Sequence, residues 1–147
     1  MSNSIPAAVS AFVRANGVAL HVRADHPAAG SRGVAGSSGA VGSSGAVGSS
    51  RTVPILYLHS LGADLRIFDG VVARLPERHH LRMDLRGHGL SDAPAGAYSI
   101  RQLAEDALGV LDAAGADTAV LVGVSVGGIV ALRAALDHPE RVAGLVL

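Results

Sequence analysis

The amino-acid sequence predicts an α/β domain built on a mostly parallel sheet. Short apolar runs that suit buried strands alternate along the chain with segments of helical periodicity, the order expected of such a fold. Residues 118–122 read Thr-Ala-Val-Leu-Val, a nearly continuous apolar run typical of a parallel strand buried on both faces. The chain has 147 residues, a length that fits one domain with a core of its own.

Two strands joined by a tight turn are predicted near the N-terminus. Residues 11–14 and 18–23 alternate apolar and polar side chains, and Asn16-Gly17 lies between them. Asn-Gly is a strong hairpin signal, because both positions of the favoured two-residue turn need a positive φ. The sheet should therefore carry an N-terminal hairpin.

A repeat interrupts the pattern after the hairpin. Residues 33–50 are three copies of a six-residue unit, G-V-A-G-S-S followed twice by G-A-V-G-S-S. Three copies without a large apolar side chain cannot bury a core. We therefore expect residues 27–52 to be a flexible, disordered insertion rich in Gly, Ser and Ala.

The elements after the insertion are predicted from periodicity and from start and stop signals. The clearest is a helix over 99–114, where Ser99 and Gln102 form a capping box and Gly115 occupies the position of a C-terminal capping glycine. Asp64 is the predicted N-cap of a helix that ends before Pro76. The predicted strands are 53–59, 80–84, 118–122 and 142–147, and the predicted helices are 64–75, 99–114 and 126–137.

Composition excludes several classes of function. Formal net charge is +0, with 12 basic and 12 acidic residues, so neither nucleic acid nor an anionic membrane is an expected partner. There are no cysteines, and no spacing of other side chains suggests a metal site or a cofactor. The sequence has no long apolar span and no signal peptide at its start, which favours a cytoplasmic location.

The stretch Gly123-Val124-Ser125-Val126-Gly127 matches the pattern G-x-S-x-G. The pattern alone is weak in a chain with 19 glycines, but here a predicted strand precedes it and a predicted helix comes after it. That context is typical of a serine nucleophile on a sharp turn, where both glycines let strand and helix approach closely. The alternative is a tight strand-to-helix turn with an incidental serine.

A serine nucleophile that attacks a carbonyl needs donors for the oxyanion that forms. The backbone N–H of Val126 opens the next helix and so points an unpaired donor towards the serine. The loop 59–62 comes after another predicted parallel strand, whose end meets the same edge of the sheet, and the N–H of Leu61 is the most plausible second donor.

Three motifs in order resemble those of the α/β-hydrolase fold family: His59-Ser60-Leu61-Gly62, D-L-R-G-H-G-L-S over 84–91, and the nucleophile turn. Within that fold, the stretches F-V-R-A-N-G-V-A-L-H and H-S-L-G-A-D-L-R-I-F-D look closest to the 3-oxoadipate enol-lactonases. The resemblance implies hydrolysis of a small-molecule ester or lactone, with 3-oxoadipate enol-lactone in aromatic catabolism as the specific expectation. Carboxylesterases and perhydrolases are similar in the same motifs and remain alternatives.

The resemblance also implies roles for single residues. Ser125 would be the nucleophile, which distinguishes this chain from dehalogenases and epoxide hydrolases, since these look to use aspartate there. Apart from the resemblance, the place of Asp84 and Arg86 at the R-G-H-G turn favours a role in bracing that loop over a chemical one, and His88 is expected to make structural hydrogen bonds there instead of acting in catalysis. The second strand of the fold runs antiparallel, so the insertion should lie at the edge of the sheet opposite the active site.

The acid and base that a serine nucleophile needs are not expected in this chain. In this fold they come after the nucleophile, and the only acidic residues or histidines after Ser125 are Asp137, His138 and Glu140. These lie at the far end of a helix that starts at the serine, roughly 18 Å away along its axis. The chain is thus expected to be a single partial domain over 1–147 that lacks the C-terminal strands and the cap. A catalytically inactive fragment and a non-catalytic binding module are the alternative interpretations.

Overall fold

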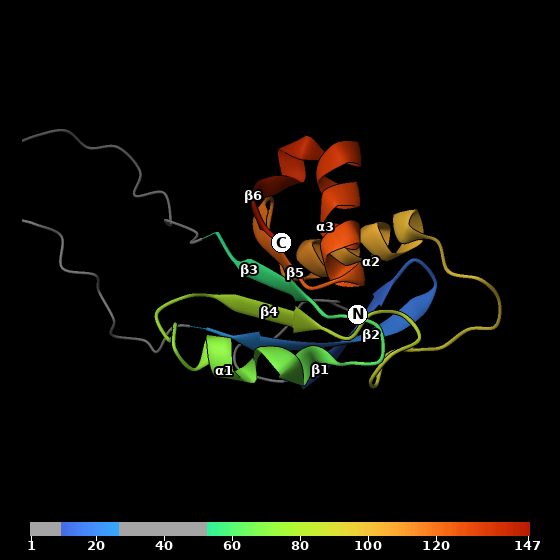
Figure 1. Ribbon diagram of the computed structural model, residues 1–147, viewed down its shortest axis with the longest axis horizontal. Helices are drawn as coiled ribbons and strands as arrows, with labels where there is room; N and C mark the ends of the chain where they lie inside the picture. The colour runs from blue at the N-terminus through green and yellow to red at the C-terminus, as the bar shows by residue number, and fades with distance from the viewer. Residues whose placement is uncertain (1–9, 27–52) are drawn as a thin grey trace, which may run out of the picture.

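The computed structural model describes residues 10–26 and 53–147. Within these ranges one six-stranded sheet has the strand order β1-β2-β4-β3-β5-β6 (Figure 1). Strands β3 to β6 pair in parallel, whereas β2 pairs antiparallel with both β1 and β4, so the mostly parallel sheet with an N-terminal hairpin is confirmed. The strands are β1 Ser10–Ala15, β2 Val18–Asp25, β3 Ile55–Leu58, β4 His80–Met83, β5 Ala119–Gly123 and β6 Val142–Val146.

The hairpin turn forms as the sequence predicts. Asn16 and Gly17 have φ of 45° and 78°, and Ala15 pairs with Val18 on either side of them. Two successive positive φ values define the turn whose twist matches that of the flanking strands. The register of β1 on β2 is set by this turn.

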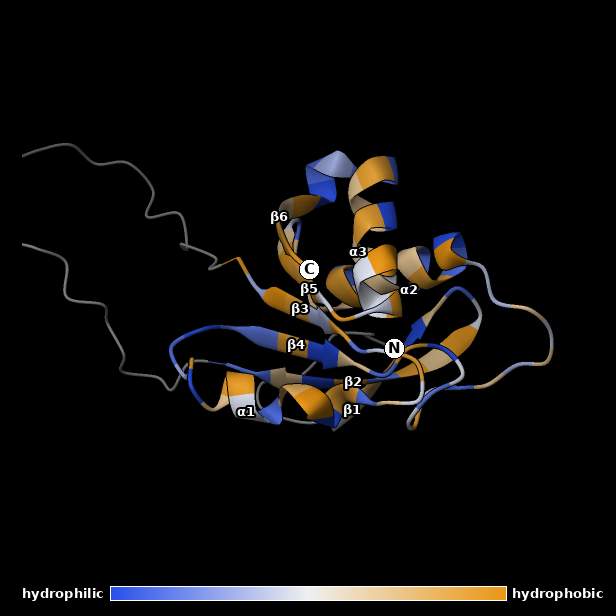
Figure 2. Cartoon of the chain, viewed as in Figure 1, coloured by the Kyte–Doolittle hydropathy of each residue, from blue (hydrophilic) through white to orange (hydrophobic). Residues whose placement is uncertain are grey.

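The two faces of the sheet differ in chemistry. One face packs against α2 Ile100–Ala113 and α3 Val126–Asp137 and forms an apolar core with Leu20, Leu56 and Leu121. Figure 2 shows this hydrophobic character along much of α3 and β3, and hydrophilic residues in part of β4. The period of two along each strand places the polar and aromatic residues of the strands on the other face.

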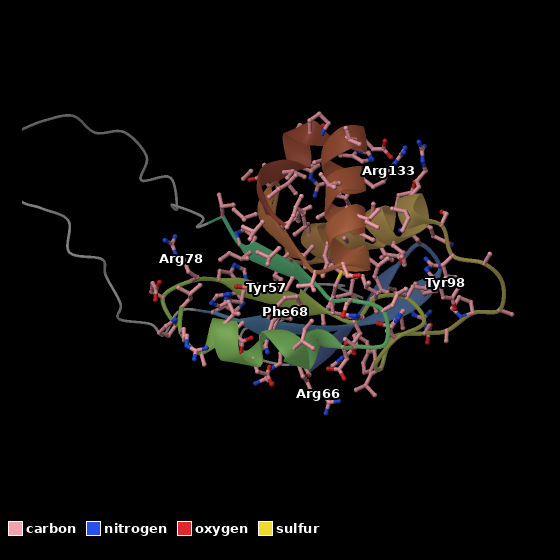
Figure 3. All side chains as sticks on the ribbon, in the orientation of Figure 1. Tyr57, Arg66, Phe68, Arg78, Tyr98 and Arg133 are labelled. Carbon is pink, nitrogen blue, oxygen red and sulfur yellow. The ribbon has the colours of Figure 1, made fainter. Side chains whose placement is uncertain are left out.

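The other face carries a short helical segment. Tyr57 of β3 meets Phe68 there, with ring centroids 4.9 Å apart (Figure 3). Arg82 of β4 is buried on the same face and forms ion pairs with Asp25 and Asp69. Charged groups can be buried under this segment because they are paired.

Helix α2 begins and ends at its predicted signals. The hydroxyl oxygen of Ser99 accepts a hydrogen bond from the N–H of Gln102 at 3.1 Å, which makes the serine half of the predicted capping box. At the other end Gly115 has φ of 64°, and the N–H groups of Gly115 and Ala116 donate to carbonyls of the last turn. This is the Schellman pattern for which glycine is favoured.

The helix predicted over 64–75 is wrong in extent. Asp64 caps the segment by accepting from the N–H of Arg66, but the next residues form a 3₁₀ helix, η1 Leu65–Phe68, and then α1 Asp69–Val72. Gly70 inside the segment weakens an α-helix by about 1 kcal/mol relative to Ala. The turns at 71–75 close with bonds from residue i+3 to residue i, as 3₁₀ geometry requires.

The predicted insertion, 27–52, lies outside the described residues, so its disorder stays a prediction. The residues on its two sides, at the end of β2 and the start of β3, are described. Asp25 at the end of β2 and Ile55 at the start of β3 both pair with His80 at the start of β4. The described residues on its two sides therefore lie at the edge of the sheet opposite the carboxyl ends of the parallel strands. Neither described range holds a helix long and apolar enough to cross a membrane.

Candidate active site

Ser125 lies on the sharp turn between β5 and α3. Its backbone has φ of 56° and ψ of −119°, and only one other non-glycine residue of the described ranges, Asn16, has a positive φ. The residue is exposed at the carboxyl edge of the sheet, where the first N–H groups of α3 also point. A serine held in such a strained conformation between a strand and a helix is the geometry of a nucleophile elbow.

The two glycines of the motif are required by close backbone contacts. A β-carbon on Gly123 would lie 2.4 Å from the carbonyl oxygen of Gly127. A β-carbon on Gly127 would lie 2.1 Å from the carbonyl oxygen of Leu58, at the end of β3. Because real β-carbons do not approach backbone atoms this closely, the turn can form only with glycine at both positions.

The loop predicted to supply the second donor begins beside this turn. Leu58 is the register partner of Gly123, and its carbonyl oxygen accepts from the N–H of Val124 at 3.0 Å. Residues 60–63 then form a tight turn, in which the N–H of Ala63 donates to the carbonyl of Ser60 at 3.2 Å. Leu61 and Val126 are thus on adjacent segments at one edge of the sheet. Their roles as oxyanion donors stay predictions.

His59 connects this loop to the end of β4. The buried ring has Nδ1 2.8 Å from the carbonyl oxygen of Ser60 and Nε2 2.9 Å from the backbone nitrogen of Leu85. Burial lowers the pKa of His59 below its ordinary value, with smaller contributions from Ser60 and neighbouring charges. A neutral ring that is engaged at both nitrogens is not available as a general base.

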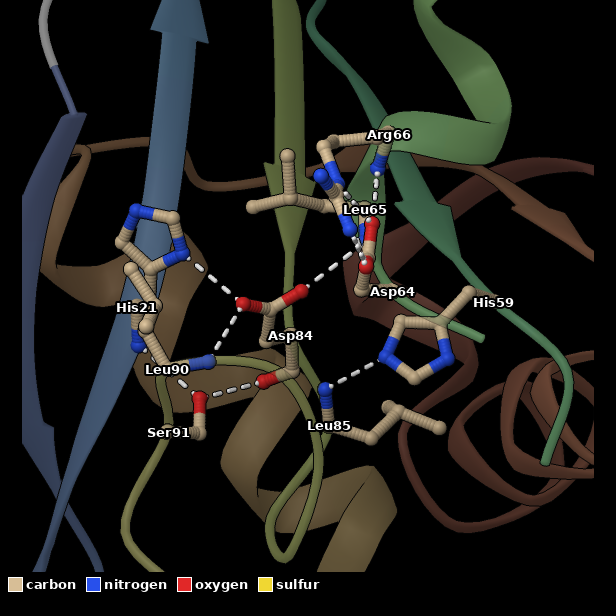
Figure 4. A network of polar contacts seen from close by, with 9 residues as sticks. All are labelled: His21, His59, Asp64, Leu65, Arg66, Asp84, Leu85, Leu90 and Ser91. Carbon is tan, nitrogen blue, oxygen red and sulfur yellow. Dashed lines mark hydrogen bonds and ion pairs between the residues drawn. The ribbon is translucent and has the colours of Figure 1, made fainter. Parts of the chain in front are cut away.

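Asp84 joins three segments around the end of β4 (Figure 4). Its carboxylate accepts from the N–H of Leu65 at 2.8 Å, from the N–H of Leu90 at 2.9 Å and from Nδ1 of His21 at 2.8 Å. The hydroxyl of Ser91 donates to the carbonyl of Asp84 at 2.7 Å. Gly89 is needed here, because a β-carbon on it would lie 2.1 Å from the carboxylate. The bracing role predicted for Asp84 is confirmed.

Arg86 braces the same loop through a partner that the sequence did not point to. Its Nε and one terminal nitrogen donate to the two carboxylate oxygens of Asp106 at 2.8 Å and 2.7 Å, and Asp106 is completely buried on α2. The side-chain amide of Asn16 also donates to Asp106. This pairing raises the pKa of Arg86. The signal available in the sequence was one acidic residue within the apolar arc of helix 99–114.

The histidines at 80, 88 and 138 contact structural groups or lie away from Ser125. His80 lies between the Tyr57 hydroxyl at 3.0 Å and the Leu75 carbonyl at 2.8 Å. His88 contacts the carbonyl of Arg86 through Nδ1 at 3.1 Å, the structural role predicted for it. His138 lies beyond α3 at the end opposite Ser125, as the sequence predicts.

Nowhere in 10–26 and 53–147 do three or more His, Asp or Glu side chains gather in a group that could hold a metal ion.

Comparison with known proteins places this architecture in a family. A model described as the alpha/beta hydrolase fold matches residues 53–147. The chain is 33% identical over 88 residues to 3-oxoadipate enol-lactonase 2 of Acinetobacter baylyi, covering 59% of this chain and 33% of that protein. It is 48% identical over 71 residues to 2-hydroxymuconate semialdehyde hydrolase of Pseudomonas putida, covering 48% of this chain and 25% of that protein.

Solved structures agree with the sequence matches. The enol-lactonase of Burkholderia xenovorans superposes with a TM-score of 0.74 at 32% identity, covering 92% of this chain and 45% of that one. The chain spans about one third of the length of the curated relatives that it matches. On its motifs, its strand order and these matches, the chain belongs to the α/β-hydrolase fold family.

Proposed function

We propose that this chain supplies the nucleophile and the oxyanion hole of a serine hydrolase that acts on an ester or a lactone. The observation that carries the proposal is the backbone of Ser125, with φ of 56° and ψ of −119° on the turn between β5 and α3. A protein tolerates strain of this kind where it serves a function, and here the strain exposes a hydroxyl at the edge of the sheet.

In the proposed reaction Ser125 Oγ attacks the carbonyl carbon of the substrate while its proton passes to a general base. The carbonyl oxygen becomes an oxyanion, which accepts hydrogen bonds from the N–H groups of Leu61 and Val126. Collapse of the tetrahedral intermediate breaks the bond to the leaving oxygen, which receives the proton from the base, and leaves an acyl group on Ser125. Water then gives a proton to the base and attacks the acyl group, and the serine oxygen leaves with that proton. In a lactone the leaving oxygen stays attached to the acyl chain, so the product is one molecule.

The described residues do not include a general base in position to take the proton of Ser125. The ring nitrogens of His59 are both engaged by the backbone, and His138 lies at the far end of α3. We therefore propose that the 147-residue chain alone turns over substrate slowly, at the residual level that oxyanion donors and substrate binding sustain without a base.

The specific substrate that we propose is 3-oxoadipate enol-lactone. Support comes from the similarity to the enol-lactonases of Acinetobacter baylyi and Burkholderia xenovorans. The similarity to 2-hydroxymuconate semialdehyde hydrolase is of comparable strength, so 2-hydroxymuconate semialdehyde is the second candidate substrate. In this proposal, the loops that carry Leu61 and Ser125 supply the reacting groups. The side chains that surround the bound substrate select it.

The test compares hydrolysis of the enol-lactone and of an aryl ester by the protein that contains this sequence and by its Ser125→Ala variant. We expect the variant to keep its fold by circular dichroism and to lose turnover by roughly 10⁴-fold or more. Thr118→Ala, just before the start of β5 and at the opposite edge of the sheet, is the matched control and should keep full activity. Unchanged turnover in Ser125→Ala would overturn the proposal.

A further inference from the structure

We propose that His59 is a positioning residue that aims the N–H of Leu61 at the oxyanion, by holding the other side of the same peptide group. The inference rests on the proposed function of Ser125. Its basis is the placement of the two ring nitrogens. Nδ1 contacts Ser60 in the loop after β3, and Nε2 contacts Leu85 at the end of β4, the contact that Figure 4 shows.

The partners of the ring fix its tautomer. The backbone nitrogen of Leu85 can only donate, so Nε2 of His59, 2.9 Å away, must be the acceptor and carries no proton. In a neutral ring the proton is then on Nδ1, which lies 2.8 Å from the carbonyl oxygen of Ser60 and donates to it. Each nitrogen has one role, and exchanging the roles would leave both partners unsatisfied.

The bond to Ser60 orients the peptide that joins Ser60 to Leu61. The described peptides are all trans, so the N–H of Leu61 points away from the carbonyl of Ser60. That carbonyl also accepts from the N–H of Ala63, which closes the turn, and Gly62 has φ of 71°, as the third position of a type II turn requires. The turn makes no use of the N–H of Leu61, which is left for a ligand.

Side-chain packing does little to hold this peptide on its Leu61 side. The side chain of Leu61 is 69% exposed, and Gly62 has no side chain. The ring of His59, at 0% exposure, ties the turn to the end of β4. Leu85 at the other side of the ring is equally buried, so the anchor is rigid. A fixed donor is worth more to catalysis than a mobile one, because no reorganisation is needed as charge develops.

The positioning contact requires a neutral ring. A proton on Nε2 would face the N–H of Leu85, and two donors repel. The charged or titratable groups around the ring are His88, which packs edge-on at 5.2 Å between ring centroids, and the carboxylates of Asp84 and Asp64. His88 and burial lower the pKa of His59 whereas the two carboxylates raise it, and the burial effect is the largest. The neutral form is therefore the one present near neutral pH.

Two substitutions separate the two contacts. In His59→Asn, the side-chain nitrogen stands near the position of Nδ1 and can still donate to Ser60, whereas the acceptor for Leu85 is lost. In His59→Gln, the side-chain oxygen stands near the position of Nε2 and can still accept from Leu85, whereas the donor to Ser60 is lost. Both remove the same buried ring, so a merely structural role predicts similar effects on activity.

The experiment measures kcat and KM for an aryl ester with the protein that contains this sequence. We expect His59→Gln to lower kcat about 10²-fold with little change in KM, as for the loss of one oxyanion donor. His59→Asn should stay within about tenfold of the unmodified protein, since its donor to Ser60 is kept. Equal losses of kcat in the two variants would overturn the positioning role. If Ser125→Ala kept its turnover, the proposed function would be overturned instead. The two failures are therefore distinguishable.

A second measurement does not depend on folding of the variants. Long-range ¹⁵N correlation spectra of the unmodified protein that contains this sequence report which ring nitrogen of each histidine is protonated. We expect His59 to show a protonated Nδ1 and an unprotonated Nε2. A proton on Nε2 would overturn the assignment, whatever the variants do.

Discussion

Gly127 at the start of α3 lies directly against the backbone of Leu58, so that a β-carbon at position 127 would be 2.1 Å from the Leu58 carbonyl oxygen. The contact fixes the nucleophile turn on the end of β3. It also sets how far the turn is from the loop that begins at residue 59. One van der Waals contact between two backbones therefore determines the relative position of the proposed nucleophile and one proposed oxyanion donor.

Gly127→Ala should displace this turn. Neither backbone can yield without breaking sheet or helix bonds, so we expect the free energy of unfolding to fall by about 3 kcal/mol. Gly128→Ala is the matched control, because its β-carbon would meet backbone atoms only at 3.4 Å or beyond. Urea unfolding of both variants checks the expectation. A Gly127→Ala variant as stable as Gly128→Ala would contradict the contact.

Gly62→Ala should act through backbone strain alone. A β-carbon there would meet nothing within 4 Å, but φ of 71° costs an L-residue about 1–2 kcal/mol. Gly62→Asn should restore part of the loss, since asparagine tolerates this conformation better. Thermal unfolding measures both variants. Equal destabilisation by alanine and asparagine would mean that crowding, not φ, limits this position.

Asp106→Ala should be strongly destabilising. It leaves the guanidinium of Arg86 buried without its carboxylate, and breaking a buried pair in this way costs about 3–5 kcal/mol. Asp112→Ala is the matched control on the same helix, because Asp112 is 65% exposed and its pair with Arg141 is worth at most about 1 kcal/mol. The difference in denaturation midpoint between the two variants decides the comparison, and a difference near zero would contradict it.

The stability of the fold should fall as the pH drops from about 6.5 to about 4. Burial lowers the pKa of His79 to about 4 from the ordinary value of 6.5, with His26 and His80 adding to the shift. In that window the unfolded chain takes up a proton at His79 that the folded chain excludes, so acid favours unfolding.

His79→Asn tests this expectation, because it should flatten the dependence of the unfolding free energy on pH in that range. His138, which is half-exposed at the end of α3, provides the control variant His138→Asn, which should leave the dependence in place. If the slope is the same with and without His79, the cause assigned to it is wrong.

The strand and helix pattern predicts most of this fold because its signals are local. Asn16-Gly17, the cap at Ser99 and the glycine at 115 each act through their own backbone conformation, which depends little on the rest of the chain. The segment 64–75 is different. Its N-cap is local, but the choice between 3₁₀ and α turns is a small energy difference that no start or stop signal encodes. The bond from the N–H of Leu65 to Asp84, nineteen residues away, is likewise absent from any sequence pattern.

In the candidate site, too, the sequence predicts the roles of some residues and not of others. The turn at Ser125 is predictable from G-x-S-x-G and its flanking elements, since the need for glycine arises from the crossing of strand and helix. The roles of His59 and Asp106 are not, because each depends on partners from another element: Leu85 for the histidine, and Arg86 with Asn16 for the aspartate. Polar residues that hold loops together carry no periodicity of their own.

Covalent trapping tests most directly whether Ser125 is a nucleophile. A fluorophosphonate probe added to the protein that contains this sequence should attach to the peptide that carries Ser125, as mass spectrometry of a digest would show. The same treatment of Ser125→Ala should give no adduct, and hydrolysis of an aryl ester should be lost in parallel. An adduct at another serine, or hydrolysis that survives in Ser125→Ala, would contradict the account.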